Sequence, residues 1–266
     1  MVISEGKERP MQSSAGEGGE GVRSVLRALD LLALFDDSHR SRSMRELIDA
    51  TGLPKSTVVR LVATLEQRGL LWSRGDGRLT PGGGLLRWAQ LAQDAWQLPP
   101  EAVECLRVLS VEAGGESSRI YIRQGISRVC VAQHEGTQQL RHVVRIGAAM
   151  PLWAGASGHV LLSGGAAQDL HRAALAAGRG PDFEAVLAER VRRAGDQGWA
   201  VSHGEREDGV SAVAAPITDA TDRVVAAVGL GGPTTRFTEE RVSAFVPVLT
   251  KAAERLSDLQ FIGGTA

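Results

Sequence analysis

Apolar residues at the start of the chain recur at helical intervals. Val22, Val25, Leu26 and Leu29 are separated by one, three or four residues, so their side chains share one face of a helix. The residues between them are mostly polar, which makes this an amphipathic helix. We expect it to end near Phe35, before a polar loop.

A second, shorter helix is predicted by its start signal rather than by its length. Ser43 and Glu46 form the Ser-x-x-Glu pattern of a capping box, in which the hydroxyl accepts a hydrogen bond from the Glu46 amide and the carboxylate reaches back. The helix should run to about Thr51, and Gly52 ends it.

A third helix follows Leu53-Pro54 and ends at Gly69. Its two faces differ in polarity: we expect Val58, Leu61, Val62 and Leu65 in the core and Ser56, Arg60, Ala63 and Gln67 outside. After it, two short apolar stretches flank Gly75-Asp76-Gly77, and Asp-Gly is a strong signal for a β-hairpin. Three helices followed by a hairpin predict a winged helix-turn-helix.

The remaining chain alternates helix and strand patterns. A helical stretch lies within residues 82–99 and ends at Pro99-Pro100, which makes a hinge. Beyond it we expect helices over 101–113, 157–162, 166–177, 182–197 and 239–259. Strands are expected over 118–123, 129–133, 140–145, 199–202, 211–217 and 224–230, with a loop at 150–156.

Length supports a protein of two domains, and the mixture of predicted helices and strands makes its fold class α+β. The chain has 266 residues, of which 43% are hydrophobic, enough for two cores. We expect a disordered tail over 1–20, a winged helix-turn-helix over 21–81, a linker helix over 82–99 and a second domain over 100–262. The net charge is −1, but residues 21–80 carry ten Lys and Arg against seven Asp and Glu.

Cysteine usage and hydropathy indicate which kinds of site and which cellular location to expect. Cys105 and Cys130 lie in apolar surroundings without metal-ligand spacing, so we expect buried free thiols and no metal or cofactor. No apolar run is long enough for a membrane span, and the polar start is not a signal peptide. These features predict a cytoplasmic protein.

Polar residues cluster where the winged unit could meet DNA. Lys55, Ser56 and Thr57 lie at the start of the third helix, where free amides and the helix dipole favour a phosphate. Arg60 lies one turn further and could reach a base edge in the major groove. The further candidates for DNA contact are Ser43, Arg74 and Arg78, the last two bracketing the hairpin tip. The alternative is that the third helix merely packs within a small module.

An enzyme is the main alternative for residues 100–260. Ser157 and His159 are tempting as a nucleophile and base, but the surrounding Gly-Ala-Ser-Gly-His is not a G-x-S-x-G motif. Two residues apart on a helix, they should also point to different sides. The acidic run Glu205, Glu207 and Asp208 is better explained as solvated surface than as a catalytic pair. We therefore expect no enzymatic activity.

Several separated stretches resemble the IclR-type bacterial transcriptional regulators. They are SVLRALDLLALF with SMRELIDATGLPKSTVVRLVATLEQRGLL, MPLWAGASGHVLL, GVSAVAAPITDATDRVVAAVGLGGP and ERVSAFVPVLTKAAERLS. The resemblance covers residues 21 to 260. It implies a GAF-like C-terminal effector-binding domain, binding of a double-stranded DNA operator, and homodimers through the N-terminal part that often pair into tetramers. We expect a repressor rather than an activator.

The resemblance also locates an effector site. It implies a ligand between the loop Met150–Gly158 and strands in 199–230, with the Gly155–Gly158 amides available to a carboxylate. Family members that bind small keto acids carry an aspartate ten residues before the cysteine of a GVRC stretch and two serines in an SVSG stretch. The matching positions here are Ser202, Ala212, Gly229 and Gly231.

These replacements remove most of the polar side chains that would hold a keto acid. Met150, Leu152 and Trp153, beside Gly155 and Ala156, would instead offer apolar and aromatic surface. We therefore expect a bulkier, mainly apolar or aromatic effector that could carry one carboxylate. The alternative is that these residues are ordinary core and the site is vestigial.

Overall fold

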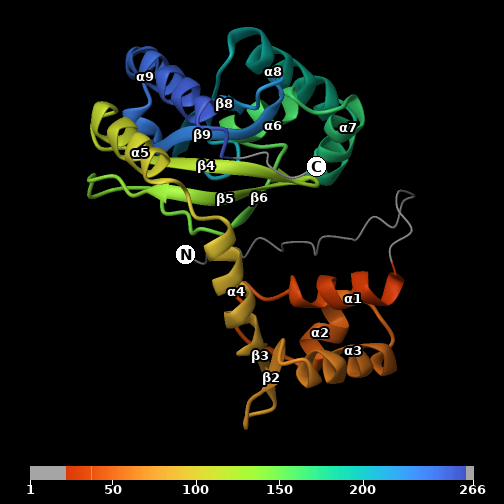
Figure 1. The fold of residues 1–266 in the computed structure, drawn as a ribbon. Coiled ribbons are helices and arrows are strands. Elements are labelled where there is room, and N and C mark those ends of the chain that lie inside the picture. The colour runs from red at the N-terminus through yellow and green to blue at the C-terminus, as the bar shows by residue number, and fades with distance from the viewer. Residues whose placement is uncertain (1–21, 37, 262–266) are drawn as a thin grey trace, which may run out of the picture. The chain divides into compact units, whose positions relative to one another are not determined.

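The structure is a computed structural model that describes residues 22–36 and 38–261 (Figure 1). The tail expected over 1–20 lies outside the described residues. The chain divides into two compact units, the first ending at Trp96 and the second beginning at Gln97. Each unit has its own hydrophobic core and is described by itself.

The first unit is the winged helix-turn-helix that the sequence predicts. Its helices are α1 (Arg23–Leu32), α2 (Met44–Thr51), α3 (Lys55–Gln67) and α4 (Gly84–Ala95), and its strands are β1 (Arg42–Ser43), β2 (Leu71–Ser73) and β3 (Arg78–Pro81). Apolar side chains from α1, α2 and α3 and from the wing strands form the core, which includes Leu31, Leu47, Val58, Val62, Leu65, Leu71 and Leu79.

Local signals determine where the helices of this unit begin and end. The Ser43 hydroxyl accepts from the Glu46 amide at 3.2 Å, and the carboxylate of Glu46 bonds the Ser43 amide, which confirms the capping box. Gly52 ends α2 in the left-handed conformation. The strand β1 was not predicted, because a two-residue strand has no periodicity; it pairs with β3 beside the hairpin.

The second unit contains one antiparallel sheet of six strands in the order β6-β5-β4-β9-β8-β7. The strands are β4 (Ser117–Gln124), β5 (Ser127–His134), β6 (Ala149–Pro151), β7 (Ala200–His203), β8 (Val210–Thr218) and β9 (Val224–Pro233). The helices are α5 (Pro100–Glu112), α6 (Ala156–Ser163), α7 (Ala167–Ala177), α8 (Phe183–Gln197) and α9 (Glu239–Asp258), with a short 3-10 turn at Thr234–Arg236.

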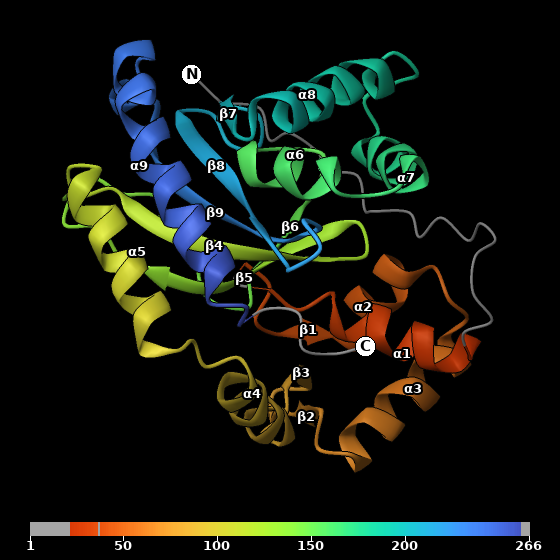
Figure 2. The ribbon, with the colours of Figure 1, turned by 45° about the horizontal axis from the view of Figure 1, so that its top comes forward.

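Helices cover both faces of this sheet, as Figure 2 shows. On one face α5 and α9 enclose a core with Leu106, Leu109, Ile120, Leu230 and Leu249. On the other face α6, α7 and α8 enclose a second core that includes Tyr121, Leu152, Val160 and Leu187. The sheet is thus buried on both faces, and the pocket described below opens on the side of α6.

The strand predicted over 140–145 is wrong. These residues form an irregular segment, and the sheet edge beside β5 is occupied by β6 instead. Two backbone carbonyls of the segment accept from arginine side chains: Leu140 from Arg236 at 2.9 Å and His142 from Arg119. Side chains of other elements therefore satisfy backbone groups that a strand would have paired. Leu140 and Val143 remain exposed.

Candidate functional sites

The N-terminus of α3 is open to solvent and uncapped. Pro54 is its N-cap residue and makes no side-chain capping bond. Lys55 and Ser56 are exposed, and Thr57 is half-buried. Free amides, the positive end of the helix dipole and one lysine therefore face the same region, which is an arrangement that favours a phosphate group.

The outer face of α3 is the polar face that the sequence predicts. Ser56, Arg60, Ala63 and Gln67 are exposed, whereas Val58, Val62 and Leu65 are buried. Among the described residues, no carboxylate pairs with the Arg60 guanidinium. Arg74, in the wing turn, lies 3.8 Å from Asp76, and both side chains are at least half exposed. A contact that weak in solvent leaves Arg74 free to exchange partners.

Arg78 and Ser43 make hydrogen bonds within the winged unit. The Arg78 guanidinium donates to the Ser41 hydroxyl at 2.9 Å and to the Ser41 carbonyl at 2.8 Å, and its Nη2 lies 3.2 Å from the Glu46 carboxylate. It therefore ties β3 to the capped end of α2. A DNA phosphate would have to compete with these partners for Arg78, and with the Glu46 amide for the Ser43 hydroxyl.

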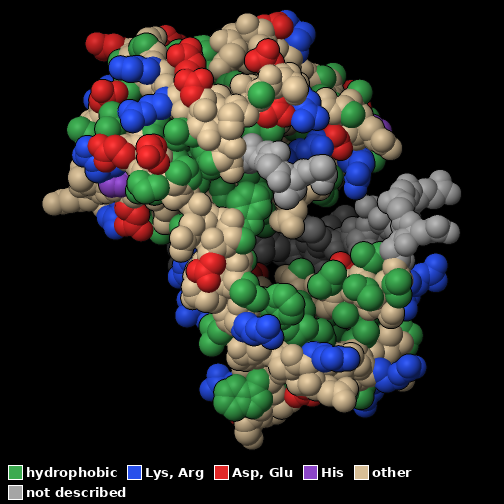
Figure 3. All heavy atoms as spheres, in the orientation of Figure 1, with side chains coloured by type: hydrophobic (Ala, Val, Ile, Leu, Met, Phe, Trp, Pro, Cys, Tyr) green, Lys and Arg blue, Asp and Glu red, His purple; other side chains and the backbone are tan. Residues whose placement is uncertain are grey.

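Large apolar side chains lie on the surface of α1 and α4. In Figure 3 hydrophobic side chains gather over this part of the winged unit. On α4, Trp88 is 60% exposed, and the Arg87 guanidinium lies 6.0 Å from the centre of its ring. A surface this apolar is typical of an interface between chains. The exposed residues are Val22, Val25, Leu26 and Leu29 along α1, and Leu86, Trp88, Leu91 and Trp96 along α4.

The second unit contains a small pocket between the sheet and the N-terminus of α6. Strand register places its floor: Ala212 pairs with Ser202 on one side and Gly231 on the other, and Gly229 pairs with Ala214. Met150, Gly155 and Ala156 contribute the opposite wall. Seven of the nine predicted effector residues therefore line one cavity: Met150, Gly155, Ala156, Ser202, Ala212, Gly229 and Gly231.

The side chains of Leu152 and Trp153, which are also predicted as effector residues, lie outside the lining of this pocket. Leu152 is fully buried in the core beneath α6. Trp153 meets Phe183 edge to face at 6.0 Å, and the Arg179 guanidinium lies 4.5 Å from its ring centre. Trp153 therefore anchors the loop to the start of α8, and Leu152 anchors it in the core.

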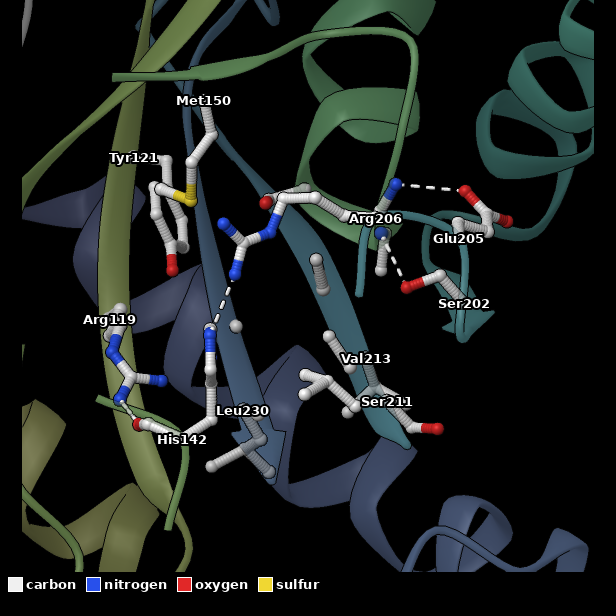
Figure 4. Close-up of a pocket in the computed structure, with 18 of the residues that line it drawn as sticks. Arg119, Tyr121, His142, Met150, Ser202, Glu205, Arg206, Ser211, Val213 and Leu230 are labelled. Atoms are coloured by element: carbon white, nitrogen blue, oxygen red, sulfur yellow. Dashed lines mark hydrogen bonds between the residues drawn. The ribbon is translucent and has the colours of Figure 1, made fainter. Parts of the chain in front are cut away.

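Sequence reasoning missed three arginines that line the pocket: Arg119, Arg128 and Arg206. Arg119 and Arg128 come from β4 and β5 and are only 3% and 5% exposed. Figure 4 shows Arg119 and Arg206 with Tyr121, Met150 and His142 around the cavity. A charged residue inside a strand that is covered on both faces was the signal that could have identified Arg119 and Arg128.

Arg128 supports the loop before α6. Its Nη1 donates to the carbonyls of Pro151 and Ala154, and its guanidinium lies 5.7 Å from the Tyr121 ring centre. Gly155 has φ +87°, and a Cβ there would lie 2.9 Å from Arg128 Nη2, so both conformation and space require glycine. Burial lowers the pKa of Arg128 to about 10, which leaves it protonated at neutral pH.

Glu205 corrects the prediction of a solvated acidic run. Its side chain is only 12% exposed, and it accepts a 2.8 Å hydrogen bond from the Gly155 amide. His159 Nε2 lies 3.1 Å and Arg190 Nη1 3.3 Å from its carboxylate oxygens. The next amide, of Ala156, donates to the Ser202 hydroxyl at 3.0 Å. The amides expected to hold an effector carboxylate thus hold side chains of the chain itself.

Arg206 and His142 lie across the cavity. Arg206 Nη2 is 2.7 Å from His142 Nε2 and also 3.1 Å from the Glu207 carboxylate (Figure 4). Burial, together with Arg206 and Arg119, lowers the pKa of His142, so its neutral ring can accept from Arg206. With Arg206 in this position the cavity measures about 50 Å³.

Comparison with known proteins identifies the family. The model for the IclR helix-turn-helix domain matches residues 24–74, and that for the bacterial transcriptional regulator IclR C-terminal domain matches residues 95–258. The chain belongs to the IclR family of bacterial transcriptional regulators. It is 30% identical to the HTH-type transcriptional regulator KipR of Bacillus subtilis over 88% of this chain and 96% of KipR. It is 26% identical to the transcriptional repressor IclR of Escherichia coli, over 94% and 93% of the two chains.

Solved structures agree with this assignment. An IclR-family regulator from Rhodococcus sp. is 45% identical, with a TM-score of 0.61 over 96% of this chain and 98% of that one. An IclR homologue from Microbacterium hydrocarbonoxydans, crystallised with 4-hydroxybenzoate, is 18% identical, with a TM-score of 0.66 over 89% and 98%. The relatives are transcriptional regulators and not enzymes, and this chain is likewise an IclR-type regulator with a DNA-binding helix-turn-helix.

One further sequence prediction, for the two cysteines, can be compared with the structure. Cys105 and Cys130 are buried free thiols, as expected. Over the described ranges, no three His, Cys, Asp or Glu side chains are grouped so that they could hold a metal ion. Within the same ranges, no helix is long and apolar enough to cross a membrane.

Proposed function

We propose that this regulator is a repressor that binds a pseudo-palindromic operator and changes its affinity for that DNA when a small organic effector enters the pocket beside α6. The observation that carries the proposal is the α3 N-terminus, where the amides of the first turn, Lys55 and Arg60 face solvent together. The similarity to the E. coli repressor supports repression over activation. Such a regulator acts on DNA in the cytoplasm.

The contacts with DNA follow from this geometry. The first turn of α3, with Lys55, Ser56 and Thr57, receives a backbone phosphate, and Arg60 reads a base edge in the major groove. Arg74 in the wing adds a contact that does not depend on sequence. Arg78 and Ser43 hold the wing and α2 in place and contribute to DNA binding mainly through this support.

A dimer is needed because one winged unit contacts only one half-site. The exposed apolar residues of α1 and α4 supply a surface that a second copy would bury, with Trp88 at its centre. Two copies related by a twofold axis would read half-sites about one helical turn apart, or a multiple of it. Pairing of two dimers into a tetramer is the further step that the family resemblance suggests.

The effector is a small organic molecule with an apolar or aromatic body. Tyr121, Met150, Ala212 and Ala214 form the apolar walls of the pocket, and Gly229 and Gly231 leave space at its floor. The complex of the Microbacterium homologue with 4-hydroxybenzoate supports a ligand of this size and type. Because Arg119 and Arg128 are buried cations beside the pocket, we also expect the ligand to carry an acid group.

Selection of DNA from a random pool by the full-length protein tests the proposal. We expect an enriched inverted repeat, with half-sites separated by about one helical turn. The matched control is Arg60→Ala, which leaves the fold intact because the Arg60 side chain is exposed. Enrichment of no symmetric sequence would contradict the proposed operator, and so would specific binding by a chain that lacks residues 21–80.

A further inference from the structure

We infer that Arg119 holds the acid group of the effector, and that the first amides before α6 do not, because the Gly155 amide already donates to Glu205 and the Ala156 amide to Ser202. This inference rests on the proposed function and gives the orientation of the effector in the pocket. It reverses the orientation that free amides would favour. The acid group then lies at the β4 side, and the opposite end of the ligand faces Ser202 and Glu205.

The first step is the occupancy of the α6 N-terminus. The Gly155 amide already donates to Glu205 and the Ala156 amide to Ser202, at 2.8 and 3.0 Å. Glu205 is further held by His159 and Arg190, at 3.1 and 3.3 Å. A ligand carboxylate at these amides would have to displace a carboxylate with three partners, and would meet its negative charge if it stayed. Both outcomes disfavour an anion there.

The second step is the state of Arg119. Its side chain is 3% exposed, and Nη2 donates to the His142 carbonyl, which is its one hydrogen bond within the described part of the chain. Nε is buried without a partner, and no carboxylate pairs with the guanidinium among the described residues. Burying a charge without a counter-ion is unfavourable, and such groups in pockets are candidates for ligand binding.

The surroundings of Arg119 leave room for a ligand. Arg119 pairs across the sheet with Gly229, and a Cβ at Gly231 would lie 3.4 Å from Arg119 Nη1. The glycine at position 231 therefore keeps space beside the guanidinium. Figure 4 draws Arg119 and Glu205 at opposite sides of the pocket. The cavity thus has a cationic end and an end that already contains an anion.

Arg128 is a second buried arginine of the pocket, and its hydrogen bonds can be compared with those of Arg119. It is equally buried and also has an unpartnered Nε, but its Nη1 bonds two carbonyls of the loop before α6. Removing it should therefore disturb the loop itself. Arg119 bonds a single carbonyl, on the irregular segment that contains His142. The two arginines are thus expected to respond differently to the same substitution.

The chemical class of the effector follows from the two ends. At the β4 side, Arg119 accommodates a carboxylate. Arg206 lines the same cavity, so its guanidinium can release the His142 ring and bind the ligand's anion instead. At the other end, Ser202 and Glu205 offer a hydroxyl and carboxylate lone pairs, which suit a ligand hydroxyl. The effector is therefore an organic acid with a hydroxyl group at the end opposite its carboxylate.

Calorimetry on the full-length protein tests the inference with pairs of probes. Each pair consists of an acid and its neutral alcohol: 4-hydroxybenzoate with 4-hydroxybenzyl alcohol, and 4-hydroxyphenylacetate with 4-hydroxyphenethyl alcohol. We expect the wild type to prefer the acid by about tenfold or more, the range of a charge-assisted hydrogen bond. Arg119→Met should abolish this preference and leave alcohol binding within about threefold. Arg119→Lys should retain part of it, since the charge remains.

Thermal unfolding without ligand provides the second readout. Arg119→Met should lower stability less than Arg128→Met, because it removes an unpaired buried charge together with one carbonyl bond, whereas Arg128→Met removes two carbonyl bonds. Preference for the acid that survives in Arg119→Met would overturn the inference, as would Arg119→Met that unfolds. Failure of both acids to bind the wild type would also overturn it. The proposed operator binding is measured separately, so its failure is distinguishable.

Discussion

The Gly155 amide donates a 2.8 Å hydrogen bond to the carboxylate of Glu205, which lies fifty residues further along the chain. This bond joins the N-terminus of α6 to the turn between β7 and β8. The same turn carries Arg206, which reaches His142. Glu205 and Arg206, adjacent in sequence, therefore connect the two sides of the pocket. A ligand that draws Arg206 away from His142 would change the contacts of this turn.

The ion pair at Glu205 predicts a pH-dependent contribution to stability. Although burial alone would raise the pKa of Glu205, the nearby His159 ring, the Gly155 amide and Arg190 lower it below its ordinary value of 4.5. A lowered folded-state pKa contributes stability above the unfolded-state pKa and loses it as the pH falls through the folded-state value. Glu205→Gln should therefore reduce the free energy of unfolding at pH 7 by roughly 1–3 kcal/mol.

The measurement is urea unfolding of wild type and Glu205→Gln between about pH 3 and 8. The difference between the two proteins should be full above the ordinary pKa of 4.5 and should shrink below it. Glu207→Gln is the control, because the Glu207 side chain is 56% exposed and its ion pair with Arg206 is weak in solvent. A difference that stays constant across this range would exclude a charged Glu205.

The sequence predicted the winged unit well because its signals are local. Helical spacing of apolar residues, the Ser43–Glu46 capping box and the Asp-Gly hairpin each depend on neighbours within a few residues. The strands β1 and β6 were missed because pairs or triplets of residues have no measurable period. The apolar residues Leu140 and Val143 suggested a strand, but their segment is held by Arg119 and Arg236 from other elements.

The pocket was predicted only in part, for a related reason. The resemblance to the family placed Ser202, Ala212 and Gly231, and the strand register brings these three into one row. Glu205 and Arg119 depend on contacts between elements that are far apart in sequence. A charged run such as that containing Glu205 is usually solvated, and only the fold shows that this residue reaches α6.

Arg60→Ala should relax base preference. The side chain is exposed on the outer face of α3, so its removal leaves the core intact. Loss of one bidentate base contact costs about 1–3 kcal/mol at a single operator position. Binding to a set of single-base operator variants, measured by fluorescence anisotropy, should become nearly uniform at that position. Arg68→Ala is the matched control, since Arg68 is exposed at the opposite end of the helix. Equal discrimination by Arg60→Ala and wild type would remove Arg60 from base readout.

Arg74→Ala and Arg78→Met should separate contact from support in the wing. Arg74→Ala should weaken binding to all sequences alike and reduce the salt slope by about one, because one phosphate contact is lost. Arg78→Met should instead lower the unfolding temperature, since it removes bonds to Ser41 and Glu46. Titration with DNA at several salt concentrations, alongside thermal unfolding, distinguishes the two effects. A normal salt slope for Arg74→Ala would exclude its phosphate contact.

Trp88→Glu should separate the proposed dimer. Trp88 is 60% exposed on α4 among Leu86 and Leu91, and tryptophans at the centre of interfaces often contribute 2 kcal/mol or more, an order-of-magnitude value. A carboxylate at that position would be buried without a partner in a dimer, which adds to the cost. Sedimentation velocity should then report monomers, and operator affinity should fall because two half-sites are no longer bound together. The control is Trp72→Glu, in which a similarly exposed tryptophan on β2 is replaced and the dimer should stay intact.

A Trp88→Glu protein that sediments as the wild type does would place the interface on another surface. Loss of the dimer in both variants would show that the added negative charge, and not the loss of Trp88, separates the two copies.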